Sequence, residues 1–140
     1  MDAMDALMGR VSAAALTEPA PDDVTLDRIL RAGMRAPDHG RMRPWRFVLV
    51  KGGARERLGD LFAAALRRRD PNAAEPMLQA ERGKALRAPL IVVVAATVKD
   101  NPKVPPVEQI VAVGAAAQNV LLAAHALGFG AMWRTGANAY

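Results

Sequence analysis

The sequence predicts one domain that mixes helices with β-strands, and two kinds of apolar pattern in its 140 residues indicate this. Apolar residues recur at helical spacing over residues 26–34 and 58–66, which is typical of helices that pack on a core. Two apolar runs, residues 46–50 and 89–96, suit strands. The second run has no polar alternation and is therefore expected to be buried on both faces in the middle of a sheet. A chain of this length usually folds as one domain.

Two helices are expected near the N-terminus, and the second of them contains residues 26–34. The first covers residues 2–9 and is capped by Asp2, and the second follows the proline-rich connector 17–23 and runs to about Arg35. Residues 70–86 are rich in proline and alanine, and we expect a broken, mobile helix there. Three residues could cap the second helix, namely Asp22, Asp23 and Thr25.

A long helix is predicted from about Val107 to Leu127. It is apolar nearly all round, so it should be buried in a core or a subunit interface, and an interface is the more natural explanation in so small a protein. Glycines at 128–130 end it, and a strand is expected near 130–134. Polar interruptions favour a buried helix over a membrane span. They are Gln118, Asn119 and His125, the last interpreted as a structural histidine with its hydrogen bonds satisfied.

The composition excludes several kinds of chemistry. The absence of cysteine removes disulfides, thiol nucleophiles and cysteine-bound metals, and it fits a reducing cytoplasm. The acidic start has no basic region and no long apolar core, so no signal peptide is expected. A net charge of +5 raises the question of nucleic acid, but the arginines are spread out and not interleaved with aromatic residues. A solvated surface is the better explanation.

The loop from Arg35 to Trp45 carries the first candidate site. It combines two prolines, a glycine, three arginines and the pair Asp38-His39, which suits an anionic ligand, especially a phosphorylated planar one. His39 is either a functional residue or a loop histidine held by its neighbour's carboxylate, and the sequence leaves both interpretations open.

Two pairs of an arginine and a hydroxyl residue form further candidate sites. Arg10 and Ser12 project to the same side of an extended segment, and Arg134 and Thr135 lie at the end of a predicted strand, where ligands of α/β proteins usually bind. An arginine fork with a small hydroxyl donor suits a phosphate. For Arg10 and Ser12, a plain surface turn is the alternative.

Three segments in this order resemble the FMN-dependent nitroreductase family, closest to its small, minimal branch of NAD(P)H nitroreductases. They are Arg10-Val11-Ser12, the stretch from Ile29 to Phe47 with Ala-Pro-Asp-His, and the stretch from Gly114 to Gly136 with Gly-Phe-Gly and Trp-Arg-Thr-Gly. The likeness covers essentially all of residues 1–140, as a single FMN-binding domain.

The resemblance implies an α+β fold with a central β-sheet flanked by helices, and a long buried helix at a dimer interface. It also implies an obligate homodimer with one FMN in each of two interface sites. The implied cofactor-binding residues are Arg10, Val11, Ser12, Trp133, Arg134 and Thr135 of one subunit, with Arg35 and His39 of its partner.

The implied activity is a ping-pong cycle. NADH or NADPH would pass hydride to the flavin, and a small-molecule acceptor such as a nitroaromatic or a quinone would take two electrons. No catalytic acid or base of the protein is nominated, and no metal, nucleic acid or membrane is expected. The alternatives are a flavin-binding or dimerisation module without turnover and a basic nucleic-acid-binding domain.

Two features depart from the family pattern. Asp38 and His39 replace small hydroxyl residues, and Arg43 stands in place of a glutamine. The chain also ends at Tyr140, whereas family members continue with another helix and a strand that crosses to the partner. The sequence is therefore expected to be a truncated or cleaved product, or to have this segment replaced, with a sheet edge left unpaired.

Overall fold

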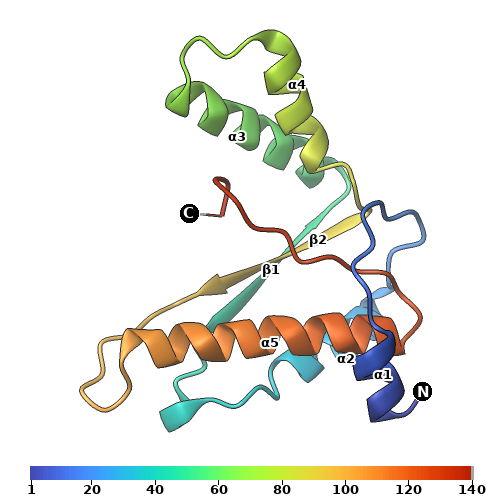
Figure 1. Ribbon diagram of the computed structural model, residues 1–140, viewed down its shortest axis with the longest axis vertical. Helices are drawn as coiled ribbons and strands as arrows, with labels where there is room; N and C mark the ends of the chain where they lie inside the picture. The colour runs from blue at the N-terminus through green and yellow to red at the C-terminus, as the bar shows by residue number, and fades with distance from the viewer. Residues whose placement is uncertain (140) are drawn as a thin grey trace. The chain divides into compact units, whose positions relative to one another are not determined.

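The structure is a computed structural model that describes residues 1–139, and contacts within it divide the chain into two compact units (Figure 1). The organisation as one domain therefore stays a prediction. The first unit comprises Met1–Ala13, Pro21–Val48 and Val93–Met132. The second comprises Ala14–Ala20, Leu49–Val92 and the chain from Trp133 onward.

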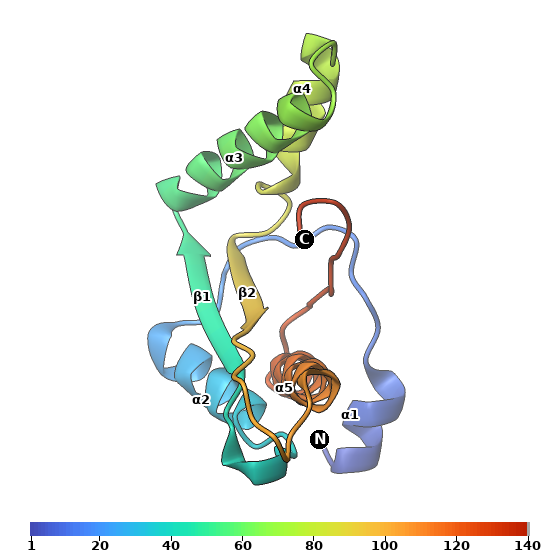
Figure 2. The same ribbon diagram turned by 90° about the vertical axis from the view of Figure 1, so that its left-hand side faces the viewer.

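The first unit is built around its longest helix, α5 (Pro106–Ala126), as predicted. Figure 2 looks along α5 and shows α2 (Asp23–Gly33) on one side of it and α1 (Ala3–Gly9) on the other. By length and composition α5 is apolar enough to cross a membrane, but it packs against α2 and α1 as the central helix of this unit. Its core contacts involve Ile29, Val120 and Ala124, with Phe47 packed against them.

The helix starts agree with the sequence because capping depends on neighbouring residues alone. Asp2 and Asp5 form a capping box at the start of α1. Asp22 caps α2 by accepting a hydrogen bond from the Thr25 N–H at 2.7 Å. This bond holds the pKa of the Asp22 carboxyl below its ordinary value.

The sheet is smaller than predicted. The strands β1 (Trp45–Lys51) and β2 (Leu90–Ala96) form a two-stranded sheet, and no residue of either strand is buried. The expectation that residues 89–96 are buried on both faces is wrong, since β1 is the one strand that pairs with β2 within residues 1–139. The strand expected near 130–134 is replaced by an isolated parallel bridge between Ser12 and Ala131.

The second unit contains two packed helices, α3 (Gly53–Arg69) and α4 (Glu75–Lys84). The helix α4 is continuous, which corrects the prediction of a broken helix, since its proline lies in the first turn, where no hydrogen bond is lost. A Cβ on Gly59 would lie 2.6 Å from the Arg82 carbonyl oxygen, so glycine permits the close approach of the two helices. Arg82 also pairs with Asp60 and Glu75.

Candidate functional site

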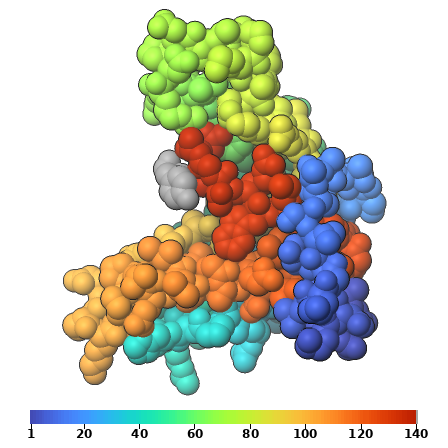
Figure 3. All heavy atoms as spheres, in the orientation of Figure 1, coloured from blue at the N-terminus to red at the C-terminus, as the bar shows by residue number. Residues whose placement is uncertain are grey.

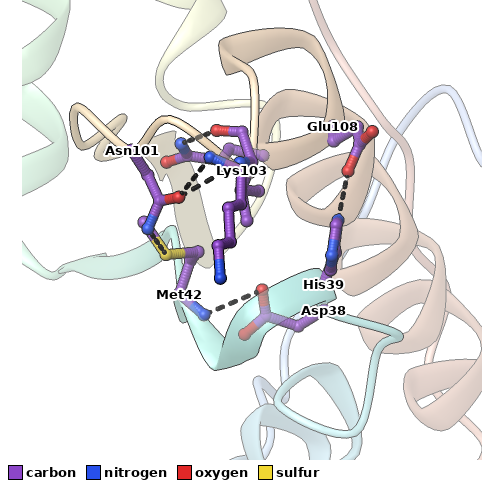
Figure 4. Close-up of polar contacts among 8 residues, drawn as sticks. Asp38, His39, Met42, Asn101, Lys103 and Glu108 are labelled. Carbon is purple, nitrogen blue, oxygen red and sulfur yellow. Dashed lines mark hydrogen bonds and ion pairs between the residues drawn. The ribbon is translucent and has the colours of Figure 1, made fainter.

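The His39 loop, residues 38–43, wraps around one carboxylate. Asp38 accepts a hydrogen bond from the backbone N–H of Met42 at 3.2 Å (Figure 4). It accepts another from the backbone N–H of Arg43 at 2.6 Å. Within this loop a short 3₁₀ helix, η1 (His39–Arg41), presents the imidazole. Arg41 and Arg43 take φ angles of 53° and 46°, a conformation that non-glycine residues rarely adopt. Such strain is often found at functional sites.

The imidazole of His39 is held by a residue that sequence reasoning missed. Its Nδ1 lies 2.6 Å from Oε2 of Glu108, in the first turn of α5 (Figure 4). The alternative of a histidine held by Asp38 is therefore wrong, because Asp38 spends both oxygens on backbone N–H groups. No signal in the sequence connects Glu108 with His39, since the two lie 69 positions apart.

The segment before α5 anchors the other side of the His39 loop. Lys99 donates from Nζ to the Met42 carbonyl oxygen at 2.9 Å. The side chain of Gln109, only 1% exposed, accepts from the Lys99 N–H and donates to the carbonyl oxygens of Lys99 and Val104. The start of α5 and the His39 loop are thus joined through residues 97–105.

A cavity of about 330 Å³ lies between the His39 loop and the first half of α5. Most of its lining residues are apolar, and Asp38, His39 and Glu108 are the polar ones. The apolar residues that line it are Pro37, Val107, Val111, Ala112 and Ala115. This combination suits a flat ligand with a polar edge.

The Arg10–Ser12 segment lies at the other end of α5. It follows α1 in extended conformation, and the Ser12–Ala131 bridge with the hydrogen bond from the Ala13 N–H to the Ala131 carbonyl oxygen fixes its backbone. Within residues 1–139, neither the Arg10 guanidinium nor the Ser12 hydroxyl makes a side-chain hydrogen bond or ion pair. Both groups are therefore available to a ligand.

His125 lies beside this segment. With Arg10 and Val11 it lines a second cavity of about 290 Å³, and its half-buried imidazole makes no hydrogen bond in the described part of the chain. The interpretation as a structural histidine with its hydrogen bonds satisfied therefore stays a prediction. Of the other polar residues of α5, Asn119 donates to the Ala32 carbonyl oxygen at 3.3 Å and Gln118 is exposed.

Within one copy of the chain, the predicted site residues lie in separate places. Arg10 lies next to His125 near the end of α5, whereas His39 lies at Glu108 near its start. These two helix positions are about 25 Å apart at 1.5 Å per residue. Arg35 is exposed just past α2. The remaining predicted residues are exposed and belong to the second unit: Trp133, Arg134 and Thr135.

The mixed fold and the Arg10–Ser12 segment agree with the family that the sequence resembles. A family model described as "Nitroreductase family" matches residues 7–140. The chain therefore belongs to the nitroreductase family, which confirms the resemblance and places it among the oxidoreductases.

Particular relatives make this more specific. The Escherichia coli K12 protein named "Putative NAD(P)H nitroreductase YdjA" is 45% identical over 139 residues, covering 98% of this chain and 74% of that protein. The "Nitroreductase-like Family Protein" of Bacillus cereus superposes with a TM-score of 0.80 at 26% identity, covering 99% of this chain and 72% of its own. The "putative nitroreductase in complex with FMN" of Desulfovibrio desulfuricans superposes with a TM-score of 0.69 at 29% identity, covering 94% and 67%.

Proposed function

We propose that this chain is an FMN-dependent NAD(P)H oxidoreductase that acts as a homodimer, with each flavin bound between two copies. Bound FMN would supply the redox chemistry, taking two electrons from NADH or NADPH and giving them to a small acceptor such as a nitroaromatic or a quinone. The names of the relatives, one of them solved with FMN, support this cofactor and this donor. The cytoplasmic location stays a prediction.

The separation of Arg10 from His39 along α5 is the observation that carries the proposal. About 25 Å of helix lies between their contacts on α5, so a flavin shared between two copies is the arrangement that we propose to bring both residues to one site. A twofold pairing whose axis crosses α5 would set the start of one α5 beside the end of the other. Each of two equivalent sites would then receive Arg10 from one subunit and His39 from its partner.

The exposed side of α5 fits such a pairing. Val107, Ile110 and Val111 follow helical spacing, and they are 63%, 54% and 66% exposed. Figure 3 shows the surface of α5, in orange, open to the viewer beside the dark blue atoms of α1. Exposed apolar side chains in a continuous stripe mark an interaction surface, and a second copy of the chain is the proposed occupant.

The donors of this chain fit a phosphorylated flavin. The free guanidinium of Arg10 and the free hydroxyl of Ser12 match the oxygens of a phosphate dianion, and each charge-assisted hydrogen bond contributes about 1.5–3 kcal/mol. Trp133 is 50% exposed, so its indole is available to a flat ring. The full proposed set is Arg10, Val11, Ser12, Trp133, Arg134 and Thr135 of one subunit, with Arg35 and His39 of its partner.

The residues of the chain would bind and orient rather than transfer protons. The arginine side chains of the proposed set would place fixed positive charge where the flavin ring develops negative charge as it is reduced. Such charge stabilises the transition state of electron transfer to the flavin without any reorganisation of the protein. No side chain is assigned as acid or base. Arg35 and His39 are the residues proposed to reach the flavin from the partner.

The first test is the flavin content of the purified protein after incubation with FMN and gel filtration. The wild-type protein should elute as a yellow dimer, and the variant Arg10→Ala/Arg134→Ala should elute without flavin. The control Arg28→Ala/Arg68→Ala removes the same charge from exposed positions outside the proposed site and should stay yellow. A colourless wild-type monomer contradicts the proposal.

Anaerobic addition of NADH or NADPH then separates an enzyme from a flavin-binding module. Bleaching of the flavin, followed by recovery of the yellow colour with a quinone, is the expected result. A bound flavin that neither cofactor bleaches would favour the module without turnover.

A further inference from the structure

We infer that Glu108 is a positioning residue for His39, which fixes the hydrogen of the imidazole on Nδ1 and leaves Nε2 as the ring atom that faces a ligand. The inference concerns the described residues of one copy, and its role in catalysis rests on the proposed function.

The geometry sets the proton position. Nδ1 of His39 lies 2.6 Å from Oε2 of Glu108, which is within hydrogen-bond distance. An ionised carboxylate only accepts hydrogen bonds, so Nδ1 must donate. In the neutral ring the hydrogen is then on Nδ1 and the lone pair is on Nε2, whereas in the charged ring Nε2 is a donor. In both states Nε2 is the nitrogen that stays available.

Both members of the pair are held by their own neighbours. The backbone that carries His39 is closed by the two hydrogen bonds to Asp38, and Lys99 adds a third at the Met42 carbonyl oxygen. Glu108 precedes Gln109, whose buried amide ties the start of α5 to residues 99 and 104. Because Asp38 is occupied by backbone N–H groups, Glu108 is the carboxylate left to orient the ring.

Stability alone does not account for this arrangement. The side chains of His39 and Glu108 are 59% and 46% exposed, and exposed pairs of this kind contribute little to folding. Both side chains also line the 330 Å³ cavity. A weak ion pair that lines a cavity, and whose backbone is held by other hydrogen bonds, is suited to orienting a side chain rather than to stabilising the fold.

The direct test is the histidine tautomer, measured by long-range ¹H–¹⁵N NMR on protein labelled at histidine nitrogen, without added FMN. The chain has two histidines, so the variant His39→Ala assigns both sets of signals. With the ring neutral, wild-type His39 should show the Nδ1–H form. A predominant Nε2–H form would overturn the inference, and this measurement requires no variant at Glu108.

Two substitutions sharpen the test. Glu108→Ala should convert most of the neutral His39 to the Nε2–H form that predominates in free histidine, and Glu108→Gln should keep Nδ1–H because its amide oxygen still accepts. Glu56→Ala removes a carboxylate from the first turn of α3 and should leave the spectrum unchanged. An unchanged His39 spectrum in Glu108→Ala would contradict the inference.

Kinetics of the flavin-loaded protein test the role in catalysis. Glu108→Ala should lower kcat for the acceptor half-reaction by roughly tenfold, and the double variant with His39→Ala should be no worse than His39→Ala alone, because coupled residues act as one unit. Additive losses would overturn the positioning role. If no FMN binds at all, the proposed function fails, while the tautomer measurement still decides the His39–Glu108 relationship.

Discussion

The carboxylate of Asp38 accepts a hydrogen bond from the backbone N–H of Arg43 at 2.6 Å, and this contact closes the loop that carries His39. The loop holds Arg41 and Arg43 at positive φ, a conformation that costs free energy. Asp38 therefore offsets backbone strain by satisfying two N–H groups, Met42 and Arg43, that the turn leaves without backbone partners.

Asp38→Ala should lower the free energy of unfolding by about 1–2 kcal/mol, because it removes two hydrogen bonds from a strained turn. Urea denaturation followed by circular dichroism measures the loss. Asp38→Asn keeps one acceptor oxygen and should lose less than the alanine variant. Equal stability of wild type and Asp38→Ala would show that the loop does not depend on this carboxylate.

The buried amide of Gln109 should contribute more to the free energy of unfolding than the carboxylate of Asp38 does. Gln109→Leu keeps the volume but removes three hydrogen bonds and leaves backbone groups of Lys99 and Val104 without partners. We expect a loss of about 2–4 kcal/mol in urea denaturation. The matched substitution Gln118→Leu, on the exposed side of the same helix, should change stability little. Similar losses in both variants would contradict the network.

Replacing two glycines of the second unit by alanine should change the stability of the protein in opposite directions. Gly59→Ala places a Cβ 2.6 Å from the Arg82 carbonyl oxygen, so α3 and α4 must move apart and the melting temperature should fall. Gly83→Ala, with nothing within 4 Å of the new Cβ, should be neutral or raise stability by up to about 1 kcal/mol through helix propensity. A stabilising Gly59→Ala would exclude this packing.

Acid should weaken the start of α2. The pKa of the Asp22 carboxyl is lowered, chiefly by the hydrogen bond from the Thr25 N–H, so its contribution is full above the ordinary value near 3.8 and is lost as pH falls through the lower folded value. Asp22→Asn keeps the cap without titrating. Urea midpoints from pH 7 to acid should therefore fall more for wild type than for Asp22→Asn. Parallel curves would contradict this assignment.

Local features were the predictable part of the fold. Asp2 and Asp22 cap their helices as the sequence suggests, and α5 ends at a glycine turn where Gly128 takes a φ of 86°. These features depend on residues within one or two turns, so a single sequence carries the information. The family resemblance predicts the fold of the whole chain, and the match of the family model to residues 7–140 confirms this resemblance.

Contacts between distant segments were not predictable. The pairing of His39 with Glu108 and the bridge between Ser12 and Ala131 join parts of the chain that only folding brings together. The burial of residues 89–96 was overestimated for a related reason: apolar composition indicates what a strand can bury, while its neighbours decide how much it does bury.

The central claim is that one flavin site takes Arg10 from one copy and His39 from the other. A stringent test uses the variants Arg10→Glu and His39→Glu, each of which should bind little FMN alone because a carboxylate faces the phosphate or the ring.

Mixing the two variants under conditions that allow subunit exchange is the most direct measurement. In a mixed dimer both substitutions fall in one site, so the other site is intact, and about a quarter of all sites should regain FMN. The control is the double variant Arg10→Glu/His39→Glu mixed with either single variant, which restores no intact site. Recovery of FMN binding in the first mixture alone is the predicted result, and no recovery despite subunit exchange would contradict the shared site.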